Sequence, residues 1–138
     1  MNELILRTFI PIQPQGKARP KIVRRANSPF PVAITPDKTV HAEQAIRWHV
    51  QQVWGERPPL DEALVVEIGA VFIKPKSKSS KVTMQTTKPD WDNIGKLVCD
   101  SLNGLLWIDD ARIMDGRVTK VYGATAGILL QVFRPVGA

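Results

Sequence analysis

The chain has 138 residues, of which 43% are hydrophobic and 23% are charged. This length and balance are typical of one globular domain with a buried core, so we expect a single domain over residues 1–138. The lone cysteine, Cys99, excludes an internal disulfide, and the sequence shows neither a signal-like start nor an apolar run long enough to span a membrane. We therefore expect a soluble cytoplasmic protein without a membrane partner.

The charge is segregated along the chain. There are 19 Lys and Arg against 13 Asp and Glu, a formal net charge of +6. Residues 1–38 hold seven bases and two acids, and residues 74–88 hold five lysines and no acid. Six of the 13 acids follow within residues 90–115. Two basic segments beside an acidic one favour a polyanionic partner with metal chemistry next to it, although a solvated lysine loop also explains residues 74–88.

The first part of the chain predicts a strand, a long loop and a helix. Residues 3–10 are rich in strand formers and stop at Pro11, which is typical of a strand. Eight of the eleven prolines fall in the first 59 residues, so a long basic loop is expected after this strand. Thr35 followed by Pro36 is a helix-start pattern, and an apolar stripe after it predicts a helix over residues 36–54.

The rest of the chain predicts three strands and a second helix. Apolar and polar residues alternate over residues 63–73, which indicates a strand with one buried face. Residues 92–105 change to a helical period, with apolar side chains on one face and polar ones on the other. Residues 112–122 and 124–133 then suggest a closing hairpin. Together these elements predict an α+β fold: a single two-layer domain with two main helices packed on one face of a mixed β-sheet.

Four aspartates flank the second predicted helix. Asp92 has a structural explanation as a helix N-cap, and Asp109 and Asp110 have one as turn residues, but a cap does not explain Asp90. If the strand after Asp110 lies beside the helix N-terminus, these carboxylates converge. Two such charges about 4 Å apart repel by roughly 4 kcal/mol at an effective dielectric of 20, so a cluster requires protonation or a cation. Oxygen ligands without Cys or His are typical of Mg²⁺ or Mn²⁺.

Lys96 completes the candidate chemistry. It follows Asp92 by four residues, so both lie on the same helix face, and an ordinary ion pair between them is the simpler explanation. The alternative is that Lys96 holds a scissile phosphate or offsets developing charge. A divalent ion beside it would activate water and stabilise a leaving phosphodiester oxygen. The aspartates, Lys96 and the basic segments together therefore predict hydrolysis of a nucleic-acid backbone.

Ordered motifs in the second half of the chain resemble the signature of the RusA-type Holliday junction resolvases, endodeoxyribonucleases of prophage and bacterial origin. The motifs are Lys88-Pro89-Asp90-Trp91-Asp92-Asn93-Ile94-Gly95-Lys96, Asp100-Ser101-Leu102-Asn103-Gly104 and Trp107-Ile108-Asp109-Asp110, and Gly16-Lys17-Ala18-Arg19-Pro20-Lys21 resembles the family's N-terminal basic motif. The resemblance implies a small α+β domain that acts as a homodimer. It also implies Mg²⁺-dependent nicks placed symmetrically across a four-way DNA junction in recombination and repair, without a nucleotide cofactor.

The resemblance also implies roles for individual residues. The catalytic set is Asp90, Asp92, Lys96 and Asp110, and the metal ligands are Asp90, Asp92, Asp109 and Asp110. The chain departs from the family pattern at Lys21, where arginine is common, and at Trp91, where an aliphatic residue is expected. From the basic segments we expect DNA to be held by nine cations: Lys17, Arg19, Lys21, Arg24, Arg25, Lys76, Lys78, Lys81 and Lys88.

Two other functions fit the same residues. A non-catalytic nucleic-acid-binding module would use the aspartates only as caps and turns, and its binding would not depend on metal. A Mg²⁺-dependent phosphohydrolase of small phosphate esters would use the carboxylates, but it would not need the positive charge of the flanking segments.

Overall fold

Four strands form a mixed sheet in the computed structural model, which describes residues 2–137. The strands lie in the order β1 (Asn2–Ile10), β6 (Gly127–Pro135), β4 (Leu64–Ile73) and β5 (Ile113–Gly123). β6 is antiparallel to both of its neighbours, whereas β5 is parallel to β4. The N- and C-terminal strands of the chain are therefore adjacent in the sheet.

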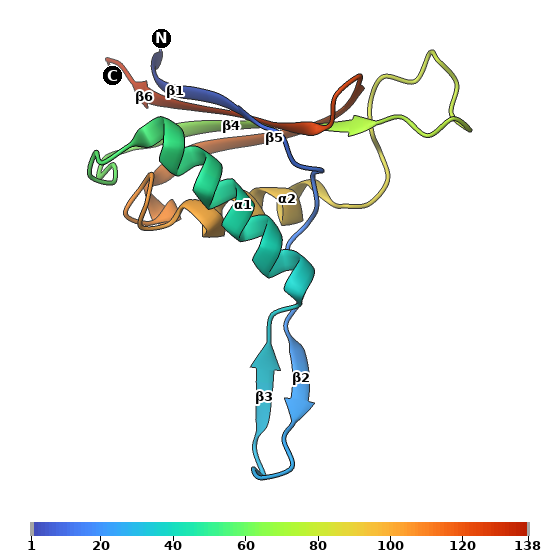
Figure 1. The fold of residues 1–138 in the computed structure, drawn as a ribbon. Helices are drawn as coiled ribbons and strands as arrows, with labels where there is room; N and C mark the ends of the chain where they lie inside the picture. The colour runs from blue at the N-terminus through green and yellow to red at the C-terminus, as the bar shows by residue number, and fades with distance from the viewer. Residues whose placement is uncertain (1, 138) are drawn as a thin grey trace.

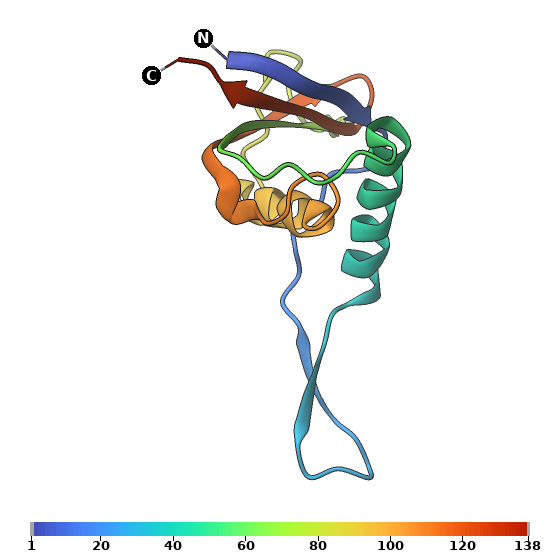
Figure 2. The ribbon, with the colours of Figure 1, turned by 90° about the vertical axis from the view of Figure 1, so that its left-hand side faces the viewer.

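Two helices cover one side of this sheet, as Figures 1 and 2 show. They are α1 (Asp37–Trp54) and α2 (Trp91–Leu102). The predicted α+β class, with two main helices on one face of a mixed sheet, is confirmed. Neither helix combines the length and the apolar composition that crossing a membrane requires, as judged over residues 2–137.

The core lies between the helices and the sheet. Four α2 side chains at helical spacing, Ile94, Leu97, Val98 and Leu102, are completely buried. They join the buried face of β4, whose alternating pattern was predicted from sequence, and the apolar stripe of α1. Because one side of α2 is fully occupied by this packing, its other side is left for solvent or ligand.

The end of α1 at Trp54 agrees with the prediction, and the other three helix ends differ from it by one to three residues. α1 begins after Pro36, which occupies the N-cap position that the sequence assigned to Thr35. α2 ends at Leu102, before Gly104, whose φ of 80° places it in the left-handed region. The predicted end at 105 was too late because a backbone that enters this region leaves the helix.

The predicted hairpin of residues 112–122 and 124–133 is wrong in its pairing. Both segments are strands, but β4 lies between β5 and β6. β5 pairs with β4 in parallel register, and parallel neighbours need a crossover connection, which α2 supplies. The short turn after Gly123 therefore joins strands that are not neighbours. Local turn residues cannot distinguish this arrangement from a hairpin.

A second sheet, of two strands, lies in the basic segment after β1 that was predicted to be a long loop. β2 (Lys21–Arg24) and β3 (Pro31–Ile34) pair antiparallel, with Lys21 opposite Ile34. This β2–β3 arm, residues 21–34, projects away from the main sheet and the helices (Figures 1 and 2). Its strands were missed because they are short and bordered by prolines, which weaken the strand pattern.

Burial on α1 predicts a local difference in stability. Ile46 is completely buried, so Ile46→Ala should lower the free energy of unfolding by about 2–5 kcal/mol, because it leaves a cavity in the core. Val53 on the same helix is 42% exposed, and Val53→Ala should change it by only about 0.5 kcal/mol. Urea unfolding followed by circular dichroism measures both values, and equal losses would contradict the assigned core.

Candidate active site

The first turn of α2 presents two of the predicted catalytic carboxylates. Asp90 occupies the N-cap position and Asp92 lies in the first turn, so the sequence placed the cap two residues too late. The Asp90 side chain makes no capping hydrogen bond. Instead its Oδ2 accepts a hydrogen bond from Nζ of Lys88 at 2.9 Å. Asp90 therefore occupies the N-cap position without making the capping hydrogen bond. Its carboxylate lies at the surface beside the Lys88 ammonium group.

Lys96 pairs with an acid other than the expected one. Its Nζ lies 3.6 Å from Oδ2 of Asp100, one turn further along α2, rather than beside Asp92. The same Asp100 oxygen lies 2.8 Å from Nζ of Lys17, which also approaches Glu43 of α1 at 3.6 Å. The hydrogen bond to Asp100 raises the pKa of Lys17. Lys17 is predicted to bind DNA. In the structure its ion pairs connect the first basic segment to both helices.

The third predicted catalytic carboxylate, Asp110, lies in the connection between α2 and β5. It begins a 3₁₀ turn, Asp110–Arg112, that leads into β5. Asp109 caps this turn, because its Oδ2 accepts a hydrogen bond from the Ala111 backbone at 3.0 Å. Burial raises the pKa of the Cys99 thiol on α2 to about 12, and the charge of Asp110 contributes to this rise. Cys99 lies on the side of α2 that faces β5, because it shares a cavity lining with Gly116, Arg117 and Val118.

A small cavity lies between α2 and β5 on this same side. Its volume is about 210 Å³, and its lining includes Trp91, Asp92, Cys99 and Arg117. Asp92 thus lies on the Cys99 side of the helix, whereas Asp90 faces Lys88. Within residues 2–137, no three His, Cys, Asp or Glu side chains form a group that could hold a metal ion. The expected convergence of Asp90, Asp92 and Asp110 is therefore not found: Asp90 pairs with Lys88, and Asp109 accepts a hydrogen bond within its own turn.

Both basic segments border the first turn of α2. The lysine segment is followed by Pro89 and Asp90, and its chain leads into α2 (Figure 1). On the other side, the Lys17 backbone donates a hydrogen bond to the Asn93 carbonyl at 3.1 Å. A Cβ on Gly16 would lie 3.0 Å from the Cβ of Asn93, so only glycine allows this close approach without displacement. The aspartates of α2 therefore lie where the two basic segments meet the helix.

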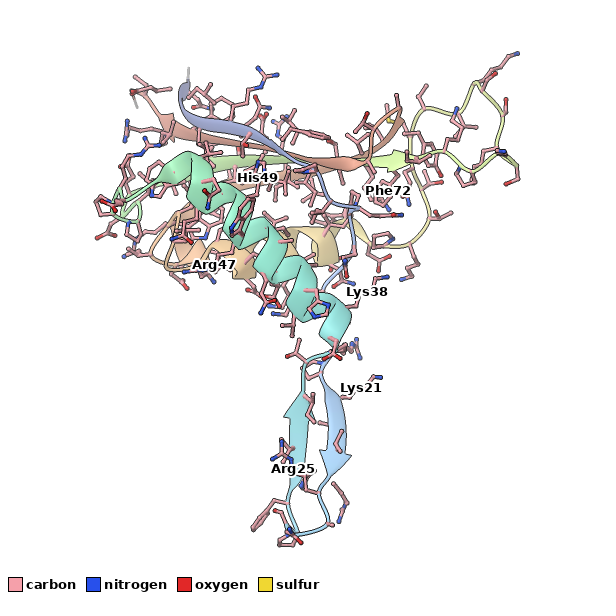
Figure 3. All side chains as sticks on the ribbon, in the orientation of Figure 1. Lys21, Arg25, Lys38, Arg47, His49 and Phe72 are labelled. Atoms are coloured by element: carbon pink, nitrogen blue, oxygen red, sulfur yellow. The ribbon has the colours of Figure 1, made fainter. Side chains whose placement is uncertain are left out.

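The other predicted DNA-binding residues are spread over two projections. Lys21 and Arg25 extend from the β2–β3 arm in Figure 3, with Arg24 on β2 and Arg19 just before the arm. All four are exposed. Lys76, Lys78, Lys81 and Lys88 belong to the loop between β4 and α2, where Lys88 has 84% of its side chain exposed.

Sequence reasoning missed several residues that build this site. The spacing of Lys96 and Asp100 is a recognisable i,i+4 signal, and it could have predicted their ion pair. Arg117 of β5 and the bond between Lys17 and Asp100 have no local signal, because they depend on how distant segments pack. Lys120 of β5, which donates to the carbonyl of Pro89 at 2.8 Å, was missed for the same reason.

The environment of Cys99 predicts an unreactive thiol. Its pKa of about 12, against an ordinary 9.0, leaves almost no thiolate at pH 8, and the thiolate is the nucleophile. Alkylation by iodoacetamide at pH 8 should therefore be at least tenfold slower in the folded protein than in the urea-unfolded chain. The rate for the folded protein should still be rising at pH values where that of the unfolded chain has levelled off. Equal rates at pH 8 would contradict the assigned environment.

Comparison with known proteins identifies the family of the chain. The family described as "Endodeoxyribonuclease RusA" matches residues 11–132. A relative, the uncharacterized protein YqaN of Bacillus subtilis (strain 168), is 46% identical over 50 residues, which make up 36% of this chain and 35% of that protein. The match thus spans about a third of that relative's length. The family match covers most of the chain, including residues 11–38 of the first basic segment, the whole second basic segment and all four predicted aspartates, so the chain belongs to the RusA endodeoxyribonuclease family.

Proposed function

We propose that this protein is a structure-selective endodeoxyribonuclease that resolves four-way DNA junctions by paired symmetric nicks. One observation carries the proposal: exposed carboxylates at the start of α2 lie where the two basic segments meet. Cations that line a surface bind the phosphate backbone of DNA, and acids at that surface serve hydrolysis rather than affinity. Family membership supports the same activity.

The acids at the site suit a hard divalent ion, Mg²⁺ with Mn²⁺ as a substitute. Asp90, Asp92 and Asp110 would hold it, with Asp109 as a neighbour. Mg²⁺ is usually bound by one or two carboxylates together with substrate phosphates and water, so the free chain does not need a preformed cluster of three ligands. Such an ion supplies Lewis-acid polarisation of a phosphate and activation of water.

Lys96 is proposed to act on the phosphate itself. Its side chain is 63% exposed, and the ion pair with Asp100 holds it on the outward side of α2. An ammonium group that is already oriented stabilises the charge that develops on a phosphate during cleavage. Asp100 orients Lys96 in this proposal, although it belongs to neither the predicted catalytic set nor the predicted metal ligands.

The β2–β3 arm is proposed to hold the DNA. A two-stranded ribbon fits the major groove, which is about 12 Å wide, and Lys21, Arg24 and Arg25 lie along or next to it. The arm carries no acid that would oppose binding. Because each chain has one catalytic site, two symmetric nicks require two chains, so we propose a homodimer as the active form.

A non-catalytic DNA-binding module is the second candidate. It is favoured by the lack of a three-ligand group within residues 2–137 and by the capping role of Asp109. It predicts binding without cleavage at any metal concentration. A nicking assay on a synthetic four-way junction and on linear duplex, with and without Mg²⁺, separates the two candidates.

Substitution of Asp92 tests the nuclease. Asp92→Asn should lower the rate of junction cutting at least a hundredfold, because it removes a charged oxygen ligand while it leaves the helix intact. Junction binding without metal should be retained, since the change removes a negative charge near phosphate. Asp37→Asn provides a matched control, because it removes a carboxylate from the first turn of α1 and should change cutting less than threefold. An Asp92→Asn protein that cuts like the wild type would refute the assignment.

Salt dependence tests the arm. Each phosphate contact contributes about 0.9 to the slope of log affinity against log salt, so the double variant Arg24→Gln, Arg25→Gln should reduce the slope by about 1.8. Arg57→Gln is the control: this residue stacks on Trp54 at the far end of α1 and should leave the slope unchanged. Gel shifts over a range of salt concentrations measure the slopes. An unchanged slope in the double variant would show that the arm does not contact phosphate.

A further inference from the structure

The turn that carries Asp90 is held by side chains from outside the family motifs. Residues 86–89 belong to no helix or strand. Nevertheless the three successive carbonyls before Asp90, those of Thr87, Lys88 and Pro89, each accept a hydrogen bond from a side chain. Since this segment has no regular backbone ladder, its conformation depends on these donors.

Lys120 supplies two of the three bonds. Its Nζ donates to the Thr87 carbonyl at 2.7 Å and to the Pro89 carbonyl at 2.8 Å. Gln85 supplies the third, from Nε2 to the Lys88 carbonyl at 3.0 Å. The Gln85 backbone in turn donates to the Lys120 carbonyl at 3.1 Å. The turn, Gln85 and Lys120 therefore form one connected unit.

This unit is anchored in the sheet. Lys120 lies on β5 opposite Ala70 of β4, and Ala70 is completely buried. Hydrogen bonds from an ammonium group are stronger than those between neutral groups, and its three donors allow one lysine to hold two carbonyls. The position of the Pro89 carbonyl, one residue before Asp90, is thus set by the sheet rather than by the exposed lysine loop.

We propose that Lys120 is a positioning residue of the nuclease site, which fixes the turn before Asp90 and thereby the placement of the Asp90 carboxylate. This inference rests on the proposed nuclease function. A misplacement of about 1 Å at a reacting group can cost as much as 10²-fold in rate, whereas DNA affinity depends on the summed cations of the arm and loop. Loss of Lys120 should therefore slow cutting without weakening binding.

The test compares Lys120→Met with a matched variant, Lys74→Met. Nζ of Lys74 also donates to two carbonyls of the same loop, those of Ser79 and Ser80, at 3.0 and 3.2 Å. Both variants remove one charge and two lysine–carbonyl bonds, but only Lys120→Met releases the turn before Asp90. Neither lysine is buried in the core, so both variants should fold.

Single-turnover cutting of a four-way junction at saturating protein should fall at least tenfold in Lys120→Met and less than threefold in Lys74→Met. Because each variant loses one positive charge, the two should bind the junction without metal with the same affinity to within twofold. If Lys120→Met cuts as fast as Lys74→Met, or if weaker binding accounts for its slower cutting, the positioning role is overturned.

Backbone amide resonances give a readout that needs no catalysis. The ¹H–¹⁵N signals of Trp91 and Asp92 should move in Lys120→Met and stay in place in Lys74→Met. Unmoved signals in Lys120→Met would overturn the inference. If the wild-type chain cuts no junction, the proposed function fails by itself, and these signals still decide whether Lys120 holds the turn.

Discussion

The packing of α2 against the sheet and α1 is the constraint on which the candidate site depends. Ile94, Leu97, Val98 and Leu102 occupy one side of the helix and are completely buried. At about 100° per residue, this orientation leaves Asp92, Lys96 and Asp100 on the opposite side or at its border. The far end of α2 is tied to α1, because Arg47, labelled in Figure 3, donates to the Ser101 carbonyl at 3.2 Å. The helix therefore cannot rotate its polar side away from the surface without losing core contacts.

Neighbouring lysines form ion pairs with two of the acids at α2. Asp90 is paired with Lys88, and Asp100 is shared between Lys17 and Lys96. Partly exposed ion pairs of this kind contribute only about 0–1 kcal/mol each, so an exchange of partners costs little. In the proposed activity, Lys17 and Lys88 would exchange their carboxylate partners for phosphate at little cost, and the divalent ion would take the place of Lys88 beside Asp90.

Individual residues show which parts of the fold and of the candidate site could be predicted from the sequence. The alternation in β4 and the helical spacing in α2 were read correctly because burial on one face imposes a period of two or of 3.6 residues. The basic segments and the aspartates were located from residue type alone, and their roles in binding and catalysis stay predictions. The β2–β3 arm was not, because two four-residue strands next to prolines give too weak a pattern. The place of Asp90 as N-cap was missed because the cap position depends on where the helix actually starts.

The sequence by itself determined the α+β class, the segregation of charge and which acids and lysines are candidates for the site. These properties depend on composition and on local periodicity, which can be read from the sequence without knowledge of the fold. Only the tertiary structure decided that β4 separates β5 from β6, that Lys17 binds Asp100, and that Lys120 holds the turn before Asp90. The reason is physical: each of these contacts joins segments far apart in the chain, and which distant partners meet is set by how the whole core packs.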